Sequence, residues 1–350
     1  VLNSNRFTVL DRIPVSDPTE MAMGPNLAFL AITNQSSDTV TFIDINPGSS
    51  TFHQVIKNTK VGRSPTGIAW DPGNEDILVT NEADSTLSVI SVFDLNVRQT
   101  VSNTLSQPFD VVITQRQTNF GYSRSVYYGW ILNRSGALSI YESGPNGPNG
   151  WGFDDVVGTV PFSFDNPRRL ALDTLNLLGS VWVVHENPLN LNGDQTGATG
   201  GAVSNVFIES AAFGQQALSA GQFTVLSLRD LGFAIKASVG EDRMTGVPVD
   251  IAFDNLINVG SMPNLATQFS AGFPQQLNGK SYVRAPGAAT GTNQPRFMFL
   301  AVPNSSEGPG VVDVISLDSG NPRVDTDVLT PGVQSVPAPG VISISDYFRQ

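Results

Sequence analysis

Cysteine is absent from the 350 residues, so the chain can form no disulfide, no thiolate metal site and no cysteine nucleophile. Histidine is scarce, because only His53 and His185 occur; this argues against a multi-histidine metal centre. No apolar run approaches the roughly 18 residues of a membrane-spanning helix. Glycine-rich phosphate-binding motifs are also missing. We therefore expect no membrane insertion, and a redox subunit that carries haem is disfavoured.

Positive charge is also sparse. The chain has 19 basic and 31 acidic residues, which gives a net charge of −12, and only four residues are lysine. This balance argues against non-specific binding to nucleic acid or to anionic lipid. The polar surface is rich in Asn and Thr instead. The missing cysteine does not fix the compartment, but the Asn- and Thr-rich, lysine-poor surface favours an extracellular or cell-surface protein of a bacterium or archaeon, exported with its signal peptide already removed.

A short pattern recurs along the chain: an apolar strand ends at an Asn, a few polar residues follow, and a second apolar strand begins. It is seen in LAFLAITNQSSDTVTFIDI (27–45), DILVTNEADSTLSVISV (76–92), VYYGWILNRSGALSIYES (126–143) and RFMFLAVPNSSEGPGVVDVISLD (296–318), and in GSVWVVHEN (179–187) with FTVLSLRD (223–230). The runs alternate or are β-branched and are too short for helices, so each pair predicts a β-hairpin. The Asn can turn the chain by bonding backbone two residues on.

Two further strands accompany each hairpin. A strand led by proline comes before four of the five hairpins, at 64–71, 107–115, 166–173 and 247–254, and the same element recurs at 338–346. Another strand follows each hairpin, at 51–59, 97–105, 154–160, 233–239 and 323–329. The unit is therefore four antiparallel strands. Its leading prolines Pro65, Pro108 and Pro167 are 43 and 59 residues apart. Four-stranded repeats of about 40–50 residues are typical of β-propeller blades.

The stretch ILVTNEADSTLSVIS, followed by QPFDVVI, resembles the YVTN repeat of β-propellers in bacterial and archaeal surface proteins, and SPTGIAWDP is similar to the inner strand of that family. The resemblance is good over 27–142, weaker over 160–254 and partial over 296–350. It implies a propeller, usually of seven blades and usually exported. We count five repeats, with six or seven possible.

We expect a single all-β propeller domain over 1–350, interrupted by insertions at about 188–222 and 255–293. The hairpin at 27–45 shows no clear inner strand before it, and the strand at 338–346 has no hairpin after it. We therefore expect the C-terminal strand to pair beside the first hairpin and close the ring, which removes exposed sheet edges.

Charged residues stand two places after the leading prolines, at Asp110, Arg169 and Asp250. Equivalent positions in a ring point alike, so these side chains should meet at the mouth of a central channel. Two interpretations stay open: a polar or ionic ligand site, including a bound cation, and a structural ring of ion pairs that satisfies buried charge.

A second candidate site lies in NPLNLNGDQTGATGG at 187–201. Asn190, Asn192 and Asp194 alternate, as oxygen ligands of calcium often do, although the later bidentate Glu of a helix-loop-helix site is missing. A polar glycine-rich loop explains the same residues without metal. Apart from possible calcium, we expect no cofactor.

The two histidines and three sequons have plainer explanations. His53 is expected in an outer strand at the surface, and His185 in the core or at the rim. Asn34, Asn133 and Asn304 fit the N-glycosylation pattern, but the repeat's turn also favours Asn and Ser there.

The insertions are candidates for partner contact, since long ordered loops on a rigid scaffold tend to carry binding. They contain Phe213, Phe269 and Phe273, which could pack the loops down or touch a partner. We expect a non-catalytic propeller that is a binding or structural module of a cell-surface or extracellular assembly. Its partner would be a protein, a surface polymer or another copy of the chain. The alternative is a lactonase-like hydrolase with a cation on the propeller axis; no G-x-S-x-G nucleophile motif occurs.

Overall fold

A computed structural model describes thirteen segments of the chain: residues 2–3, 8–71, 73–113, 127–143, 154–172, 181–208, 233–239, 244–253, 275–277, 280–282, 297–306, 310–316 and 323–324. All regular elements within these segments are β-strands. None of them contains a helix long and apolar enough to cross a membrane.

The strands form five four-stranded antiparallel sheets, which we call blades 1 to 5. Blade 1 contains β3 (Pro18–Met23), β4 (Phe29–Asn34), β5 (Thr39–Asp44) and β6 (Val55–Lys60). Blade 2 contains β7 (Pro65–Trp70), β8 (Asp76–Asn81), β9 (Thr86–Ser91) and β10 (Val97–Val101). Blade 3 contains β11 (Pro108–Ile113), β12 (Tyr128–Asn133), β13 (Leu138–Glu142) and β14 (Asp155–Thr159). Blade 4 contains β15 (Asp165–Ala171), β16 (Val181–Glu186), β17 (Gly201–Ile208) and β18 (Phe233–Val239). Blade 5 contains β19 (Asp250–Phe253), β22 (Phe297–Val302), β23 (Val311–Ser316) and β24 (Arg323–Val324).

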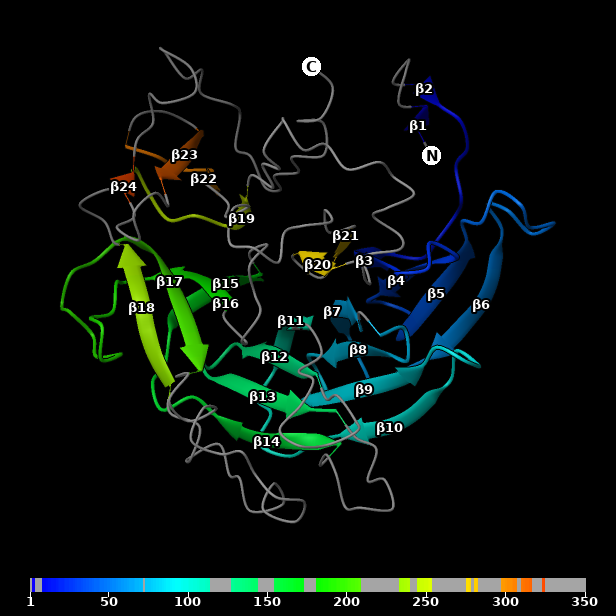
Figure 1. The fold of residues 1–350 in the computed structure, drawn as a ribbon, viewed down its shortest axis with the longest axis horizontal. Coiled ribbons are helices and arrows are strands. Elements are labelled where there is room, and N and C mark those ends of the chain that lie inside the picture. The colour runs from blue at the N-terminus through cyan, green and yellow to red at the C-terminus, as the bar shows by residue number, and fades with distance from the viewer. Residues whose placement is uncertain are drawn as a thin grey trace, which may run out of the picture.

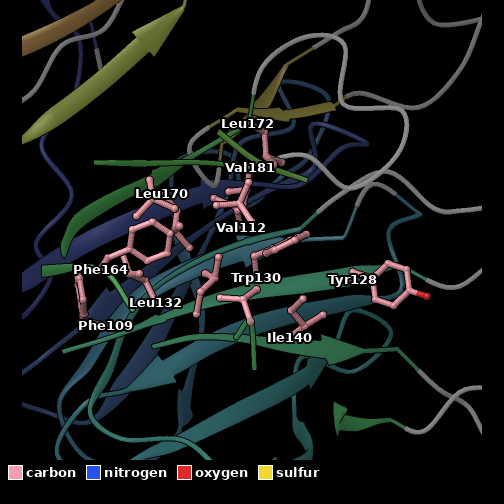
Figure 2. Close-up of a cluster of buried hydrophobic side chains, with 14 of the residues drawn as sticks. Phe109, Val112, Tyr128, Trp130, Leu132, Ile140, Phe164, Leu170, Leu172 and Val181 are labelled. Carbon is pink, nitrogen blue, oxygen red and sulfur yellow. The ribbon is translucent and has the colours of Figure 1, made fainter. Parts of the chain in front are cut away.

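The blades pack face to face through apolar side chains. Strands such as β8 and β12 are buried along their whole length, as expected of strands covered on both faces. Each of four hydrophobic clusters joins two successive blades. Figure 2 shows the cluster between blades 3 and 4, where Trp130 and Leu132 of β12 face Leu170 of β15, with Phe164 beside them.

The first strands of the blades lie at the centre of the arrangement. In Figure 1, β3, β7 and β11 lie toward the middle, and β6, β10 and β14 lie at the rim. The pairs β3 with β7, β7 with β11, β11 with β15 and β15 with β19 are in contact. The predicted blades of four antiparallel strands, with the proline-led strand innermost, are therefore confirmed.

The first hairpin has its own inner strand, so the expectation that it lacks one is wrong. β3 pairs with β4 in the register Met21↔Ile32, and β5 pairs with the other edge of β4. The C-terminal strand therefore cannot occupy the inner edge of β4. Residues 338–346 lie outside the described residues, and closure of the ring by them stays a prediction.

Blade 4 also differs from the prediction. The hairpin partner of β16 is β17, in the register Val183↔Ser204, and not 223–230; β15 pairs with the other edge of β16. The predicted insertion at 188–222 therefore contains a blade strand, and the segment between β16 and β17 ends at residue 200. Residues 223–230 lie outside the described residues. Two short hairpins complete the strands, β1 (Leu2–Asn3) with β2 (Thr8–Val9) and β20 (Gln275–Leu277) with β21 (Lys280–Tyr282).

The repeated Asn has a different role from the predicted one. Its amide nitrogen donates across the hairpin to a buried hydroxyl, from Asn34 to Thr41 Oγ1 at 2.8 Å and from Asn81 to Ser88 Oγ at 2.9 Å. Asn133 donates to Ser139 Oγ at 3.0 Å in the same way. Asn34 and Asn133 are buried, so their amides are not accessible to a sugar in the folded protein. Among the three sequons, only Asn304 is exposed.

His185 replaces the repeated Asn in blade 4. In blade 2, Val79 pairs with Ser88, and Asn81 stands two residues after Val79. In blade 4, Val183 pairs with Ser204, and His185 stands two residues after Val183. His185 Nε2 lies 2.8 Å from Ser204 Oγ and Nδ1 lies 2.7 Å from the carbonyl oxygen of Glu186. Burial lowers the pKa of His185 to about 4, so the ring is neutral at physiological pH. This agrees with its predicted place in the core.

The substitution His185→Asn is therefore expected to be tolerated, within about 1 kcal/mol at pH 7.5, because Asn can reproduce the bond to Ser204. His185→Leu should cost about 1–3 kcal/mol because it removes the buried hydrogen bond between His185 Nε2 and Ser204 Oγ. The depressed pKa means that wild type binds fewer protons than its unfolded chain between about pH 4 and 6.5. Urea unfolding should thus show wild type losing stability relative to His185→Asn as the pH falls through that window. A constant difference would contradict the assignment.

Candidate functional site

The inner strands of blades 1 to 4 begin with the same backbone irregularity, which determines the direction of their first side chains. In blades 1 to 4, the residue before the leading proline has a left-handed backbone: Asp17, Ser64, Gln107 and Asn166. In blades 1 to 4, the pairing with the next strand shifts register just after this point. Such bulges re-aim a side chain relative to the regular pleat. The position two residues after the proline lies at this shift in every one of the four.

Hydroxyl groups satisfy the backbone at these bulges. The N–H of Glu20 donates to Thr33 Oγ1 at 3.0 Å, and the N–H of Gly67 donates to Thr80 Oγ1 at 2.8 Å. Both threonines come directly before the repeated Asn of their strand. The Thr-Asn pair therefore supports the blade twice: Thr holds the inner strand, and Asn holds the third strand.

Gly67 is the one uncharged residue among these positions in blades 1 to 5, and close packing explains it. A Cβ at Gly67 would lie 2.8 Å from Asp110 Cα and 3.0 Å from the Phe109 carbonyl oxygen. Both are backbone atoms of β11, so the neighbouring inner strand would have to move.

The substitution Gly67→Ala is expected to lower the free energy of unfolding by about 1–3 kcal/mol, as other overpacking substitutions do. Gly48→Ala is the matched control, because a Cβ there would meet only the Asn46 side chain, at 3.4 Å; it should change stability by less than about 0.5 kcal/mol. Denaturant titration of both variants measures this. Equal effects would show that β7 and β11 are not so close.

Arg169 gathers the charged side chains at the centre. Its Nη1 lies 3.7 Å from Asp110 Oδ1 and its Nε lies 3.6 Å from Asp250 Oδ1. Its Nη2 donates to Glu20 Oε1. The four residues come from blades 3, 4, 5 and 1, so one guanidinium meets three carboxylates from three other blades. The structure thus brings Asp110, Arg169 and Asp250 together; their use as a ligand site stays a prediction.

The sequence prediction missed Glu20. It stands two places after Pro18, and so obeys the rule that identified the others. The strand was overlooked because PTEMAM has little apolar pattern: only Ala22 is buried, and Met21 is 50% exposed. The Asp-Pro dipeptide followed by a charge two places on was the signal that could have found it.

Two carboxyl groups of this cluster, Glu20 and Asp110, have raised pKa values. Burial raises the pKa of Glu20 to about 7, although Arg169 opposes the shift and Asp110 adds to it. Burial likewise raises the pKa of Asp110, whose Oδ2 accepts the backbone N–H of Leu170 in blade 4 at 2.7 Å. Burial disfavours the charge of Arg169, but the three carboxylates more than offset this and raise its pKa. Arg169 therefore stays charged.

The raised pKa of Glu20 predicts a pH effect with a definite sign. The folded chain binds a proton that the unfolded chain releases between about pH 4.5 and 7, so the stability due to protonated Glu20 is lost as the pH rises through this window. Glu20→Gln mimics the neutral form and should not lose it. We expect the variant to gain roughly 1–3 kcal/mol on wild type between pH 4.5 and pH 8. Unfolding curves at both pH values check this, and a gain in the opposite direction would refute it.

The other predicted site residues lie elsewhere. Asn190, Asn192 and Asp194 share an exposed loop, where Asn190 Oδ1 accepts the N–H groups of Asn192 at 2.8 Å and of Asp194 at 3.0 Å. The loop geometry therefore uses that oxygen internally, and calcium there stays a prediction. Within the described segments, no group of three or more His, Cys, Asp or Glu side chains could hold a metal ion. Phe213, Phe269 and Phe273 lie outside the described residues.

His53 is not in an outer strand as predicted. It lies in the turn before β6, with a left-handed backbone. Its ring is 3.7 Å from that of Phe52, and its Nδ1 is 3.5 Å from Asp11 Oδ2. The side chain is 18% exposed, so it is half-buried at the rim of blade 1.

The four-stranded blades, with their inner strands around a common centre, define the class of the protein as a β-propeller. The charged residues at that centre, Glu20, Asp110, Arg169 and Asp250, form what we call the axial cluster. Known structures share this fold. Hydrazine synthase of Kuenenia stuttgartiensis is similar over 91% of this chain and 70% of its own, with 16% identity and a TM-score of 0.54. A Bacteroides fragilis protein described as a candidate 6-phosphogluconolactonase is similar over 97% and 77%, with 8% identity and a TM-score of 0.56.

A third similar structure is the Swd1 β-propeller domain of Myceliophteria thermophila, with 9% identity over 95% of this chain and 91% of that one, and a TM-score of 0.42. At these identities the similarities to hydrazine synthase and to the Bacteroides fragilis protein show the fold alone. No family profile matches the sequence, and neither does any curated protein.

Proposed function

We propose that this chain is a non-catalytic β-propeller, similar to the YVTN-repeat proteins, that acts as a binding or structural module of an extracellular or cell-surface assembly. Its partner is a protein, a surface polymer or a further copy of the chain, reached through the inserted loops. The observation that carries the proposal is that Glu20, Asp110 and Asp250 all form ion pairs with Arg169.

The arrangement weighs against the alternative, a lactonase-like hydrolase with a cation on the axis. Such a cation would need carboxylate oxygens, and the carboxylates of the axial cluster are already paired with a guanidinium. A metal ion would have to displace the charged Arg169, whose side chain is partly buried, with 24% exposed. The charge that a catalytic cation would bring is thus already supplied by the protein, in a form that cannot activate water.

Turnover measurements test the proposal against this alternative. Purified protein would be incubated with a panel of lactones, 6-phosphogluconolactone among them, after treatment with EDTA and again with 5 mM calcium. We expect no hydrolysis above the buffer rate and no calcium-dependent rise in melting temperature. Calcium-dependent hydrolysis that falls in Asp110→Asn and Asp250→Asn, but not in Asp94→Asn at the rim, would overturn the proposal.

The proposed location has its own test. Lys60 is 68% exposed in its side chain, so an amine-reactive biotin reagent that does not cross membranes should label it on intact producing cells. We expect labelling on intact cells equal to that on lysed cells. Labelling that appears only after lysis would contradict a surface or extracellular location.

A further inference from the structure

Asn304 differs from the asparagines of the other two Asn-x-Ser/Thr sequences because it stands outside the repeated hairpin position. In blade 1, Asn34 pairs with Thr39, which is the last pair before the connection between the two strands. In blade 5 the last pair is Val302 with Val311, so Val302 holds that position and Asn304 comes two residues later. The buried hairpin bond that explains Asn34 therefore does not explain Asn304.

The backbone beside Asn304 is held in place, while its acceptor groups face solvent. Ser305 forms an isolated β-bridge with Gly246, and the N–H of Ser306 donates to the carbonyl oxygen of Thr245 at 2.7 Å. Asn304 and Ser306 are exposed, whereas Ser305 between them is partly buried. Alternate residues of an extended segment point to the same side, so the amide of Asn304 and the hydroxyl of Ser306 are presented together.

This part of blade 5 lies on the face of the propeller where the inner strands begin. In blades 1 to 3 the start of the inner strand pairs with the end of the second strand, as Pro65 pairs with Asn81. In blade 5, Asp250 of the axial cluster pairs with Ala301, three residues before Asn304. A group attached to Asn304 would thus stand on this face, beyond the end of β22, and would leave the packing of the blade strands unchanged.

We propose that the folded chain carries an N-linked glycan on Asn304, and not on Asn34 or Asn133. The donor is a lipid-pyrophosphate-linked oligosaccharide, used by an oligosaccharyltransferase that acts on folded proteins. Asn304 Nδ2 forms a bond to the anomeric carbon of the sugar, the bond from that carbon to the pyrophosphate oxygen breaks, and Nδ2 gives up one proton to a base of the transferase. Ser306 supplies the hydroxyl that the acceptor sequence requires. An encounter with such an enzyme rests on the proposed extracellular location.

Modification of the folded chain in vitro tests the acceptor site without depending on location. The unglycosylated chain would be incubated with a single-subunit oligosaccharyltransferase and its lipid-linked donor, and occupancy would be measured by peptide mapping. We expect occupancy at Asn304 to exceed that at Asn34 or Asn133 by about tenfold or more, because glycan acceptors are surface groups and those two amides are buried. After cleavage at the lysines and loss of the fold, Asn34 and Asn133 should become acceptors too.

The matched variants are Ser306→Ala and Ser306→Thr. The first removes the required hydroxyl and should abolish modification of Asn304, whereas the second retains a hydroxyl and should be modified as wild type is. An unmodified Asn304 in the folded wild type would overturn the proposal. Equal occupancy at Asn34, Asn133 and Asn304 in the folded chain would also overturn it, because burial would then not select the site.

Peptide mapping of the protein collected from its producing cells tests the site in its own setting. We expect the peptide that contains Asn304 to carry the additional mass of a glycan. An unmodified Asn304 there overturns the proposal wherever the protein is found, whereas biotin labelling of Lys60 reports the location alone. Failure of this inference and failure of the proposed location are therefore distinguishable.

Discussion

Replacing Arg169 by methionine is expected to lower the free energy of unfolding by about 3–5 kcal/mol at pH 8, because removing one partner of a buried ion pair leaves uncompensated charge. Three carboxylates, from Glu20, Asp110 and Asp250, would then face one another without a cation. The loss should be smaller at pH 5. Glu20 and Asp110 have raised pKa values in the wild-type fold, and without Arg169 they take up protons still more readily.

Arg168→Met is the control for this prediction. Arg168 is next in sequence but is more exposed and pairs with Glu186 at 2.7 Å. Exposed pairs of this kind contribute up to about 1 kcal/mol. Denaturant unfolding of the two variants at pH 5 and pH 8 separates the cases. If Arg169→Met costs no more than Arg168→Met at pH 8, the axial cluster does not hold the blades together.

Arg98→Met is the second substitution with a large expected effect, about 2–4 kcal/mol. Arg98 of β10 donates from Nε to Asp76 Oδ1 at 2.8 Å and from Nη2 to Asp76 Oδ2 at 3.0 Å. It also donates from Nη2 to Asp154 Oδ1 at 2.9 Å, which links blade 2 to blade 3. Asp76 is 6% exposed, so the substitution would leave a buried carboxylate without its cation.

Two tyrosines donate further hydrogen bonds to the carboxylates that pair with Arg98. Tyr127 Oη donates to Asp76 Oδ2 at 2.9 Å, and Tyr141 Oη donates to Asp154. We therefore expect Asp76→Asn to recover part of the loss when combined with Arg98→Met. The control is Arg63→Met. Arg63 pairs with Asp84, but its side chain is 69% exposed, so its loss should cost less than about 1 kcal/mol. A loss no larger for Arg98→Met, in the same unfolding assay, would show that this network does not bind the two blades.

The blade pattern was predictable because each unit repeats the same local chemistry. Alternating apolar strands, a leading proline and a Thr-Asn or Leu-Asn ending identify the strands of blades 2 and 3 without long-range information. In blade 1 the same pattern identifies the hairpin β4–β5 but not the inner strand β3. The prediction that Asp110, Arg169 and Asp250 meet needed only the assumption that equivalent positions in a ring point alike. The ion pairs at 3.6 and 3.7 Å agree with it.

The errors arose where tertiary contacts override the local pattern. β3 has few buried residues, so its place beside β4 comes from pairing and from Thr33, whose hydroxyl accepts the Glu20 N–H. Residues 187–200 separate β17 from β16. This connection is much longer than those of the hairpins in blades 1 to 3, so the local pattern of those hairpins does not identify β17. The position of β20–β21 in contact with β3, β7 and β11 depends on distant segments, for which a local pattern contains no signal.

The account depends most on Arg169 of blade 4 meeting Glu20 of blade 1 across the centre, although 149 residues separate them. A double-mutant cycle measures this directly, with the unfolding free energies of wild type, Arg169→Met, Glu20→Gln and the double variant at pH 8. We predict a coupling energy of about 1–3 kcal/mol, as expected for residues in one ion-pair network. Effects that add to within about 0.5 kcal/mol would mean that the two side chains do not meet.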